Sequence, residues 1–176
     1  DPSIGMIGDV SIPKEPYVIA TIHRFENVRK KETLNKIVGL LGSVSEKFKL
    51  IFILHKITEK KLIKFGLFEK LGSLSNIELR PRYDYFRFIK LLKSSEFVIS
   101  DGGSNQEECA YLGKPVLLFR NVTERNEGLG SNAVLSGFDP QIVADFTDNY
   151  RSLAKNTERT RLSPSAIIAD YCVDFK

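Results

Sequence analysis

The sequence predicts a single α/β domain, a Rossmann-like parallel sheet flanked by helices. Continuous apolar, β-prone runs recur along the chain, and such runs are typical of strands buried on both faces of a parallel sheet. Segments with apolar side chains at helical spacing separate these runs, which favours parallel strands joined by right-handed crossovers. The length of 176 residues fits one domain, and 42% hydrophobic with 27% charged residues is enough apolar material for a core.

The expected elements alternate from strand to helix along the chain. The strands are predicted over residues 17–22, 50–54, 77–79, 97–99 and 116–119. The helices are predicted over residues 31–48, 58–71, 85–93, 106–112, about 139–146 and about 163–171. Asp139 is the expected N-cap of the fifth helix and Pro140 its first residue, while Ser163 and Pro164 open the last one. Residues 1–16, rich in Pro and Gly, are expected to be a linker or entry segment, and residues 17–176 the domain.

The charge balance limits the classes of partner. Lys and Arg number 26 against 22 Asp and Glu, a net charge of +4 that suits an anionic ligand and permits nucleic acid without indicating it. No apolar run reaches the roughly 18–20 residues that span a bilayer, and no secretory signal is visible. We therefore expect a cytoplasmic protein that binds no membrane, with Cys109 and Cys172 as reduced thiols.

Polar side chains follow the first two expected strands. Ligands of open parallel α/β sheets bind beyond the carboxyl ends of the strands, so His23, Arg24 and Glu26, and His55 after the second strand, are candidate site residues. The alternatives are that His23 is a half-buried structural histidine, that Arg24 and Glu26 form a surface ion pair, and that His55 is a capping or hydrogen-bonding residue.

A Gly-Gly turn gives the sharpest indication of a ligand. Residues 100–108 read SDGGSNQEE, in which Gly102 and Gly103 permit a tight turn before a helix that is expected to begin at Ser104 or Asn105. The amino-terminal end of such a helix suits a diphosphate, and a carboxylate one turn further on can accept hydrogen bonds from ribose hydroxyls. The alternative is a plain turn capped by Ser104. The pattern is neither a nucleophile elbow nor a P-loop.

A glycine-punctuated loop follows the last long apolar run, at residues 120–130. Arg125 in this loop is a candidate phosphate ligand. Residues 128–133 fit G-x-G-x-x-[GA], but no strand directly precedes them, so the match to a dinucleotide fingerprint is accidental.

Three motifs together resemble the UDP-N-acetylglucosamine 2-epimerase family: HRFEN at 23–27, SDGGSNQEE at 100–108 followed by LGKPV at 112–116, and TERNEG at 123–128. The resemblance implies one half of the two-domain architecture of B-type glycosyltransferases, here the carboxyl-terminal, UDP-binding half. It implies His23 as an active-site histidine, Gly102, Gly103 and Ser104 at the UDP phosphates, Glu108 on the ribose and Arg125 in the substrate cleft. Further site candidates are Arg24, Glu26, His55 and Phe88.

Two departures from the family pattern stand out. The family has Ser-Gly-Gly where this chain has Gly102-Gly103-Ser104, and many bacterial members have His-x-Asn-Pro where it has HKIT at 55–58. The first removes a hydroxyl from the phosphate turn, and the second bears on any regulatory substrate site there.

The function expected from the resemblance is the nucleotide-sugar-binding half of a UDP-GlcNAc 2-epimerase, with neither cofactor nor metal. Its expected partners are UDP-GlcNAc or UDP and an amino-terminal domain that supplies acid/base carboxylates, and the complete parent is expected to be a homodimer. The chain alone is expected to be inactive. The runner-up is the donor-binding domain of a B-type glycosyltransferase, and a third hypothesis is a non-catalytic receiver-like or RNA-binding module.

Overall fold

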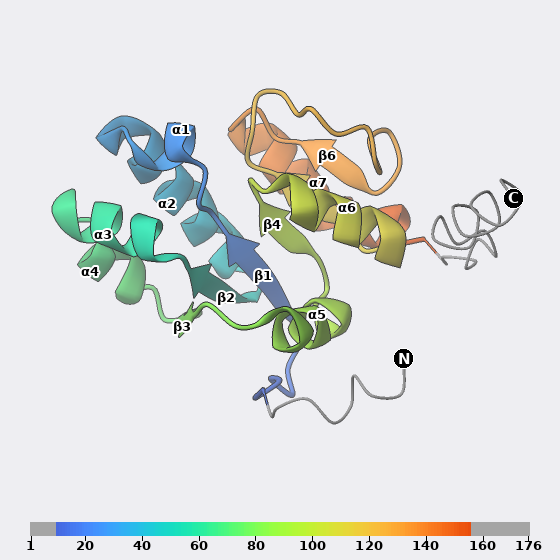
Figure 1. Ribbon diagram of the computed structural model, residues 1–176, viewed down its shortest axis with the longest axis horizontal. Helices are drawn as coiled ribbons and strands as arrows, with labels where there is room; N and C mark the ends of the chain where they lie inside the picture. The colour runs from blue at the N-terminus through green and yellow to red at the C-terminus, as the bar shows by residue number, and fades with distance from the viewer. Residues whose placement is uncertain (1–9, 156–176) are drawn as a thin grey trace, which may run out of the picture.

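The structure, a computed structural model, describes residues 10–155 and contains a six-stranded parallel sheet with strand order β3-β2-β1-β4-β5-β6 (Figure 1). Every neighbouring pair of strands runs parallel. This confirms the predicted α/β class. The strands are β1 (Tyr17–Thr21), β2 (Lys49–Leu54), β3 (Ile77–Pro81), β4 (Val98–Ser100), β5 (Val116–Leu118) and β6 (Ala133–Leu135).

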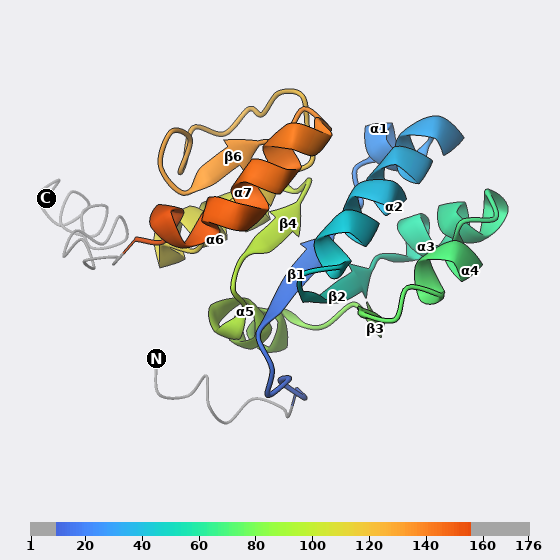
Figure 2. The same cartoon turned by 180° about the vertical axis from the view of Figure 1, so that it is seen from behind.

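Helices cover both faces of this sheet. They are α1 (Phe25–Val28), α2 (Lys31–Ser45), α3 (Lys56–Lys64), α4 (Phe68–Gly72), α5 (Tyr85–Ser94), α6 (Gly103–Leu112) and α7 (Pro140–Leu153). Helices α5 and α6 lie on the face seen in Figure 1, and α2 and α7 lie on the opposite face, seen in Figure 2.

Each face has its own hydrophobic core, because successive strand side chains point to opposite faces. Val18 and Ala20 of β1 pack in the core under α2 and α7, whereas Tyr17 and Ile19 pack in the core under α5 and α6. All four side chains are buried. The continuous apolar run of the sequence is thus the direct consequence of a strand covered on both sides.

The element boundaries depart from prediction in several places. The helix predicted over 58–71 is two helices, α3 and α4, because Gly66 between them adopts a left-handed φ of +69°. Helix α2 ends at Ser45 rather than residue 48, and α7 continues to Leu153 because Tyr150 extends its buried face. The short α1 and β6 were not predicted, since a single helical turn and a three-residue strand leave little periodic signal.

The predicted cap of α7 is confirmed. Asp139 accepts a hydrogen bond of 2.7 Å from the Gln141 amide, and Pro140 is the first helical residue. Residues 10–16 form no helix or strand, and Cys109 is a buried free thiol. The helix predicted near 163–171 and Cys172 lie outside the described residues. Within the described part of the chain, no helix is both long enough and apolar enough to cross a bilayer.

The strand order brings the predicted site segments together. Strand β1 pairs with β2 on one side and with β4 on the other, and Thr21 of β1 is in register with Ser100 of β4. Because all strands are parallel, their carboxyl ends share one edge of the sheet. Residues that follow β1, β2 and β4 are therefore neighbours in space, as expected for the crevice of an open α/β sheet.

Candidate functional site

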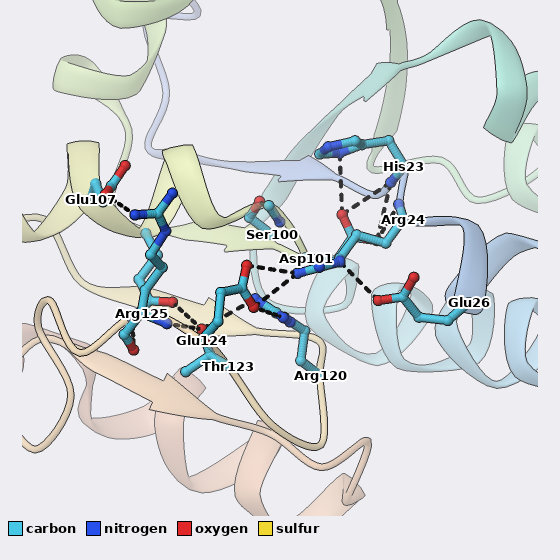
Figure 3. A network of polar contacts seen from close by, with 12 residues as sticks. His23, Arg24, Glu26, Ser100, Asp101, Glu107, Arg120, Thr123, Glu124 and Arg125 are labelled. Carbon is cyan, nitrogen blue, oxygen red and sulfur yellow. Dashed lines mark hydrogen bonds and ion pairs between the residues drawn. The ribbon is translucent and has the colours of Figure 1, made fainter.

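The buried carboxylate of Asp101, the first residue after β4, lies at the centre of this edge. Its oxygens accept hydrogen bonds from the His23 amide at 3.0 and 3.1 Å and the Arg24 amide at 2.9 Å (Figure 3). The Asn27 side-chain amide donates a further one at 2.9 Å. Asp101 is fully buried. It therefore ties the turn after β1 to the turn after β4. Burial alone would raise the pKa of Asp101, but its contacts with His23 and Arg24 outweigh burial and lower the pKa below its usual value.

The His23 ring is held between two groups. Its Nδ1 lies 3.2 Å from Asp101 Oδ1, an ion-pair distance, and the ring stacks on His55 with centroids 4.5 Å apart. A Cβ on Gly102 would lie 2.9 Å from His23 Cε1, a distance shorter than Cβ atoms show in proteins. Glycine at position 102 therefore lets the His23 ring lie this close to the turn after β4. The structure thus brings His23 and Gly102 together, as the sequence predicted from separate strands.

His55 follows β2 and precedes α3. Its Nε2 makes a hydrogen bond of 3.2 Å with Thr21 Oγ1, so the alternative of a hydrogen-bonding residue is confirmed. His55 also occupies the N-cap position of α3, but its side chain makes no cap hydrogen bond. Burial, followed by the positive charges of His23 and Arg82, lowers the pKa of His55 to about 4. The His55 imidazole is therefore neutral at physiological pH.

This lowered pKa predicts a loss of stability in acid. Between about pH 6.5 and 4 the unfolded chain binds a proton at His55 that the folded chain does not, so the free energy of unfolding falls as pH falls through this window. One proton bound only by the unfolded chain changes the free energy of unfolding by about 1.4 kcal/mol per pH unit. Because the His55 ring is only half-buried and solvent screens it, we expect a smaller change. Glu108, whose pKa is raised by burial and by Glu107, acts in the opposite direction.

Denaturant unfolding of wild type and His55→Gln at several pH values checks this prediction. The variant should show a shallower decline of stability between pH 6.5 and 4. Parallel pH profiles for the two proteins would contradict the assignment of the decline to His55.

A pocket of about 180 Å³ opens beside the two histidines at the same sheet edge. Four of the predicted site residues line it: His55, Phe88, Ser104 and Glu108. Tyr83 and Tyr85 add aromatic rings, and the rest of the lining is Thr21, Ile53, Arg82 and Asn105. The structure thus places a carboxylate of α6 and several aromatic side chains around one small cavity.

The amino-terminal end of α6 lies between this pocket and the loop that follows β5. The predicted helix start at Ser104 or Asn105 is wrong by one or two residues, since α6 begins at Gly103 with Gly102 as N-cap. No side chain caps this end, because the capping position itself is a glycine; the Gly102 amide donates to Ser100 Oγ at 3.0 Å. The amide groups of an uncapped first turn and the helix dipole favour an anion here.

The buried side chain of Gln106 holds the loop after β5 against α6. Its Nε2 donates to the backbone oxygens of Arg125 at 3.1 Å and Glu127 at 2.9 Å, and its Oε1 accepts from Thr123 Oγ1 at 2.8 Å. Gln106 is fully buried. These contacts bring Arg125 to the start of α6, where its Nε lies 3.3 Å from the position that a Cβ on Gly103 would take.

Arginine and glutamate side chains surround this end of α6 (Figure 3). Arg125 Nη1 lies 2.9 Å from Glu107 Oε1. Arg24 contacts Glu26 at 2.8 Å, the surface pair that the sequence allowed, and also Glu124 at 3.3 Å. Glu124 pairs in addition with Arg120, whose guanidinium is mostly buried, and hydrogen bonds from Arg120 lower the pKa of Glu124 to about 2.

Sequence reasoning missed Asp101, Arg120 and Glu124 as members of the site. Asp101 stood next to the quoted Gly-Gly turn, and its position directly after a buried strand was the available signal. Glu124 lies in the quoted TERNEG motif and Arg120 in the loop at 120–130, but nothing in the sequence indicated their pairing, which depends on how the loop after β5 folds back. The histidine turn, the uncapped helix start and the paired arginines thus lie together at one sheet edge of a Rossmann-like domain, an arrangement that favours an anionic ligand.

Comparison with known proteins gives this class a family. A family model described as UDP-N-acetylglucosamine 2-epimerase matches residues 4–164, so the chain belongs to the UDP-N-acetylglucosamine 2-epimerase family. A UDP-N-acetylglucosamine 2-epimerase of Methanococcus maripaludis is 38% identical in an alignment of 137 residues that covers 76% of this chain and 37% of that relative.

Solved structures agree with this membership. The UDP-GlcNAc 2-epimerase of Methanocaldococcus jannaschii in complex with UDP-GlcNAc and UDP has a TM-score of 0.75 and 29% identity, over 90% of this chain and 46% of that one. The Neisseria meningitidis enzyme bound to UDP-GlcNAc has a TM-score of 0.74 and 26% identity, over 90% of this chain and 45% of that one. An Escherichia coli heptosyltransferase, at 15% identity and a TM-score of 0.51, shares the fold. The chain thus spans less than half the length of each of these relatives.

Proposed function

We propose that this chain is the nucleotide-sugar-binding half of a UDP-N-acetylglucosamine 2-epimerase, which interconverts UDP-GlcNAc and UDP-ManNAc or releases ManNAc and UDP. The observation that carries the proposal is the convergence of His23, the uncapped end of α6 and Arg125 at one edge of the sheet. Two relatives of similar fold have structures with UDP-GlcNAc, which supports the choice of ligand.

In this proposal the diphosphate lies at the amino-terminal end of α6. The amides of Gly103 and Ser104 and the guanidinium of Arg125 stabilise its negative charge, and the glycines let the phosphates approach the backbone. The half-buried carboxylate of Glu108 accepts hydrogen bonds from ribose hydroxyls. The nucleoside occupies the adjoining pocket, where the ring of Phe88 packs against it.

The proposed reaction removes the proton at C2 of the sugar and breaks the C1–O bond, which releases UDP and leaves a C1–C2 double bond. UDP then re-forms the bond to C1 while a proton returns to C2 on the face opposite to the one from which it left. Departure of UDP places negative charge on the diphosphate, so a preorganised cationic site lowers the barrier. His23 donates a hydrogen bond at the diphosphate or the sugar. The groups that remove and return the C2 proton come from the portion of the relatives that this chain does not match. Docking with that portion, a homodimeric complete protein and a cytoplasmic location belong to the same proposal.

Calorimetric titration of the chain with UDP, uridine and single-stranded RNA tests the ligand class. We expect UDP to bind and uridine to bind at least about tenfold more weakly, because a charge-assisted hydrogen bond contributes roughly 1.5–3 kcal/mol. Preferential binding of RNA, or equal affinity for uridine and UDP, would contradict a diphosphate site.

Incubation of the chain with UDP-GlcNAc, followed by proton NMR of the sugar, tests whether it is half of the catalyst. We expect no UDP-ManNAc and no free ManNAc above the buffer control. Epimerisation at the rate of a full-length relative would show that the 176 residues hold the complete machinery, and transfer chemistry would require an acceptor that this assay omits.

A further inference from the structure

Arg125, the arginine assigned to the diphosphate, already has an anionic partner in the free protein. Its Nη1 lies 2.9 Å from Glu107 Oε1, and the two side chains are 45% and 40% exposed. Its Nε lies beside Gly103, at the end of α6 where the diphosphate is proposed to bind. A ligand that uses Arg125 must therefore take the guanidinium from Glu107 or share it.

Arg120, another arginine at this edge, is paired in a different way. The Arg120 side chain is only 8% exposed, and its contact with Glu124 satisfies a mostly buried charge, which makes that pair part of the loop structure. The Glu107–Arg125 pair faces solvent on both sides, and such exposed pairs contribute about 0–1 kcal/mol. Arg24 also makes partly exposed pairs, with Glu26 and Glu124, but Arg125 is the more exposed arginine and its Nε lies beside Gly103. The Glu107–Arg125 pair is therefore the one placed to exchange with a phosphate at the start of α6.

We propose that Glu107 is an affinity-determining residue that competes with the ligand's diphosphate for Arg125. This inference rests on the proposed function. The carboxylate holds the guanidinium at the end of α6 while the site is empty and opposes its transfer to phosphate. Ligands without phosphates do not need Arg125, so Glu107 lowers affinity for UDP and leaves affinity for uridine unaffected. The consequence for a catalyst that must release UDP is a weaker hold on the leaving group.

Glu107 also has Glu108 as a neighbour, and the test must distinguish an effect through Glu108 from an effect through Arg125. Glu107 lies beside Glu108 along α6 and raises the pKa of Glu108, after the larger effect of burial. An effect of Glu107 on ribose binding through Glu108 would alter affinity for uridine as much as for UDP. A general repulsion between Glu107 and the phosphates would persist when Arg125 is removed.

The experiment is a double-mutant cycle measured by calorimetry above pH 7 at fixed ionic strength. Glu107→Gln should bind UDP about two- to fivefold more tightly than wild type, the factor by which an exposed ion pair competes. Uridine affinity should be unchanged. In an Arg125→Ala background, Glu107→Gln should have no effect on UDP affinity. Glu127→Gln, on the loop held by Gln106, is the charge-matched control, because the Glu127 side chain makes no ion pair within residues 10–155. The UDP affinity of this variant should equal that of wild type within experimental error.

Several outcomes would overturn the proposal. Weaker UDP binding by Glu107→Gln would mean that Glu107 orients Arg125 for the ligand. Equal tightening for uridine would assign the effect to Glu108, and tightening that persists without Arg125 would assign it to simple repulsion. If wild type binds UDP and Glu107→Gln binds it with the same affinity, this inference alone is overturned. If wild type does not bind UDP, both this inference and the proposed function are overturned.

Discussion

Replacing Asp101 with Asn is expected to lower the free energy of unfolding by about 3–5 kcal/mol, the usual cost of breaking a buried charged network. The carboxylate is fully buried and accepts hydrogen bonds from the His23 and Arg24 amides and the Asn27 side chain. An Asn side chain of the same shape presents one oxygen and one NH₂ group, so at least one buried donor faces another donor. The negative charge opposite His23 Nδ1 is lost as well.

Urea unfolding monitored by circular dichroism measures this loss. Asp84→Asn is the matched control, because Asp84 also accepts a backbone amide and pairs with an arginine, but at an exposed helix start where Asn caps equally well. We expect that control to cost less than about 1 kcal/mol. If both variants unfold at the same urea concentration as wild type, Asp101 does not hold the two turns together.

The sheet was predictable because its signal is local. A run such as residues 17–22 is β-prone throughout and apolar except at Thr21. A strand covered on both faces buries such a run, with Val18 in one core and Ile19 in the other. Strand β6 escaped prediction because its three residues include two that are only partly buried, at the edge of the sheet. Gly66 shows the converse: one left-handed residue divides a helix whose apolar spacing is uninterrupted.

The candidate site was predictable where chemistry follows strand ends. Parallel strands place their carboxyl ends together, which is enough to bring His23, His55 and the Gly-Gly turn to one edge without knowing their contacts. Ion pairing was not predictable in the same way. Arg125 and Glu107 are far apart in sequence, and their contact requires Gln106 to hold the loop after β5 against α6.

The last expectation concerns Arg125→Ala, which should weaken UDP binding by about 1.5–3 kcal/mol, or roughly 10- to 150-fold, under the proposed function. The guanidinium lies at the start of α6, so it reinforces the same phosphates as the helix amides. The Arg125 side chain is 45% exposed and its ion partner Glu107 is 40% exposed. The substitution therefore leaves no buried cavity, and water solvates the carboxylate that loses its partner. The fold should therefore remain intact while the affinity falls.

Calorimetry with UDP, alongside thermal unfolding of the unliganded variant, separates binding from stability. Arg87→Ala is the matched control, because Arg87 is 41% exposed and also pairs with a carboxylate, at 2.8 Å, but belongs to α5 and is not among the neighbours of Gly103 at the start of α6. A selective loss for Arg125→Ala would identify a contact with the ligand, since both variants remove one positive charge from the domain. Equal losses for the two variants would mean that net charge alone attracts UDP, and unchanged affinity in a folded Arg125→Ala would remove this arginine from the site.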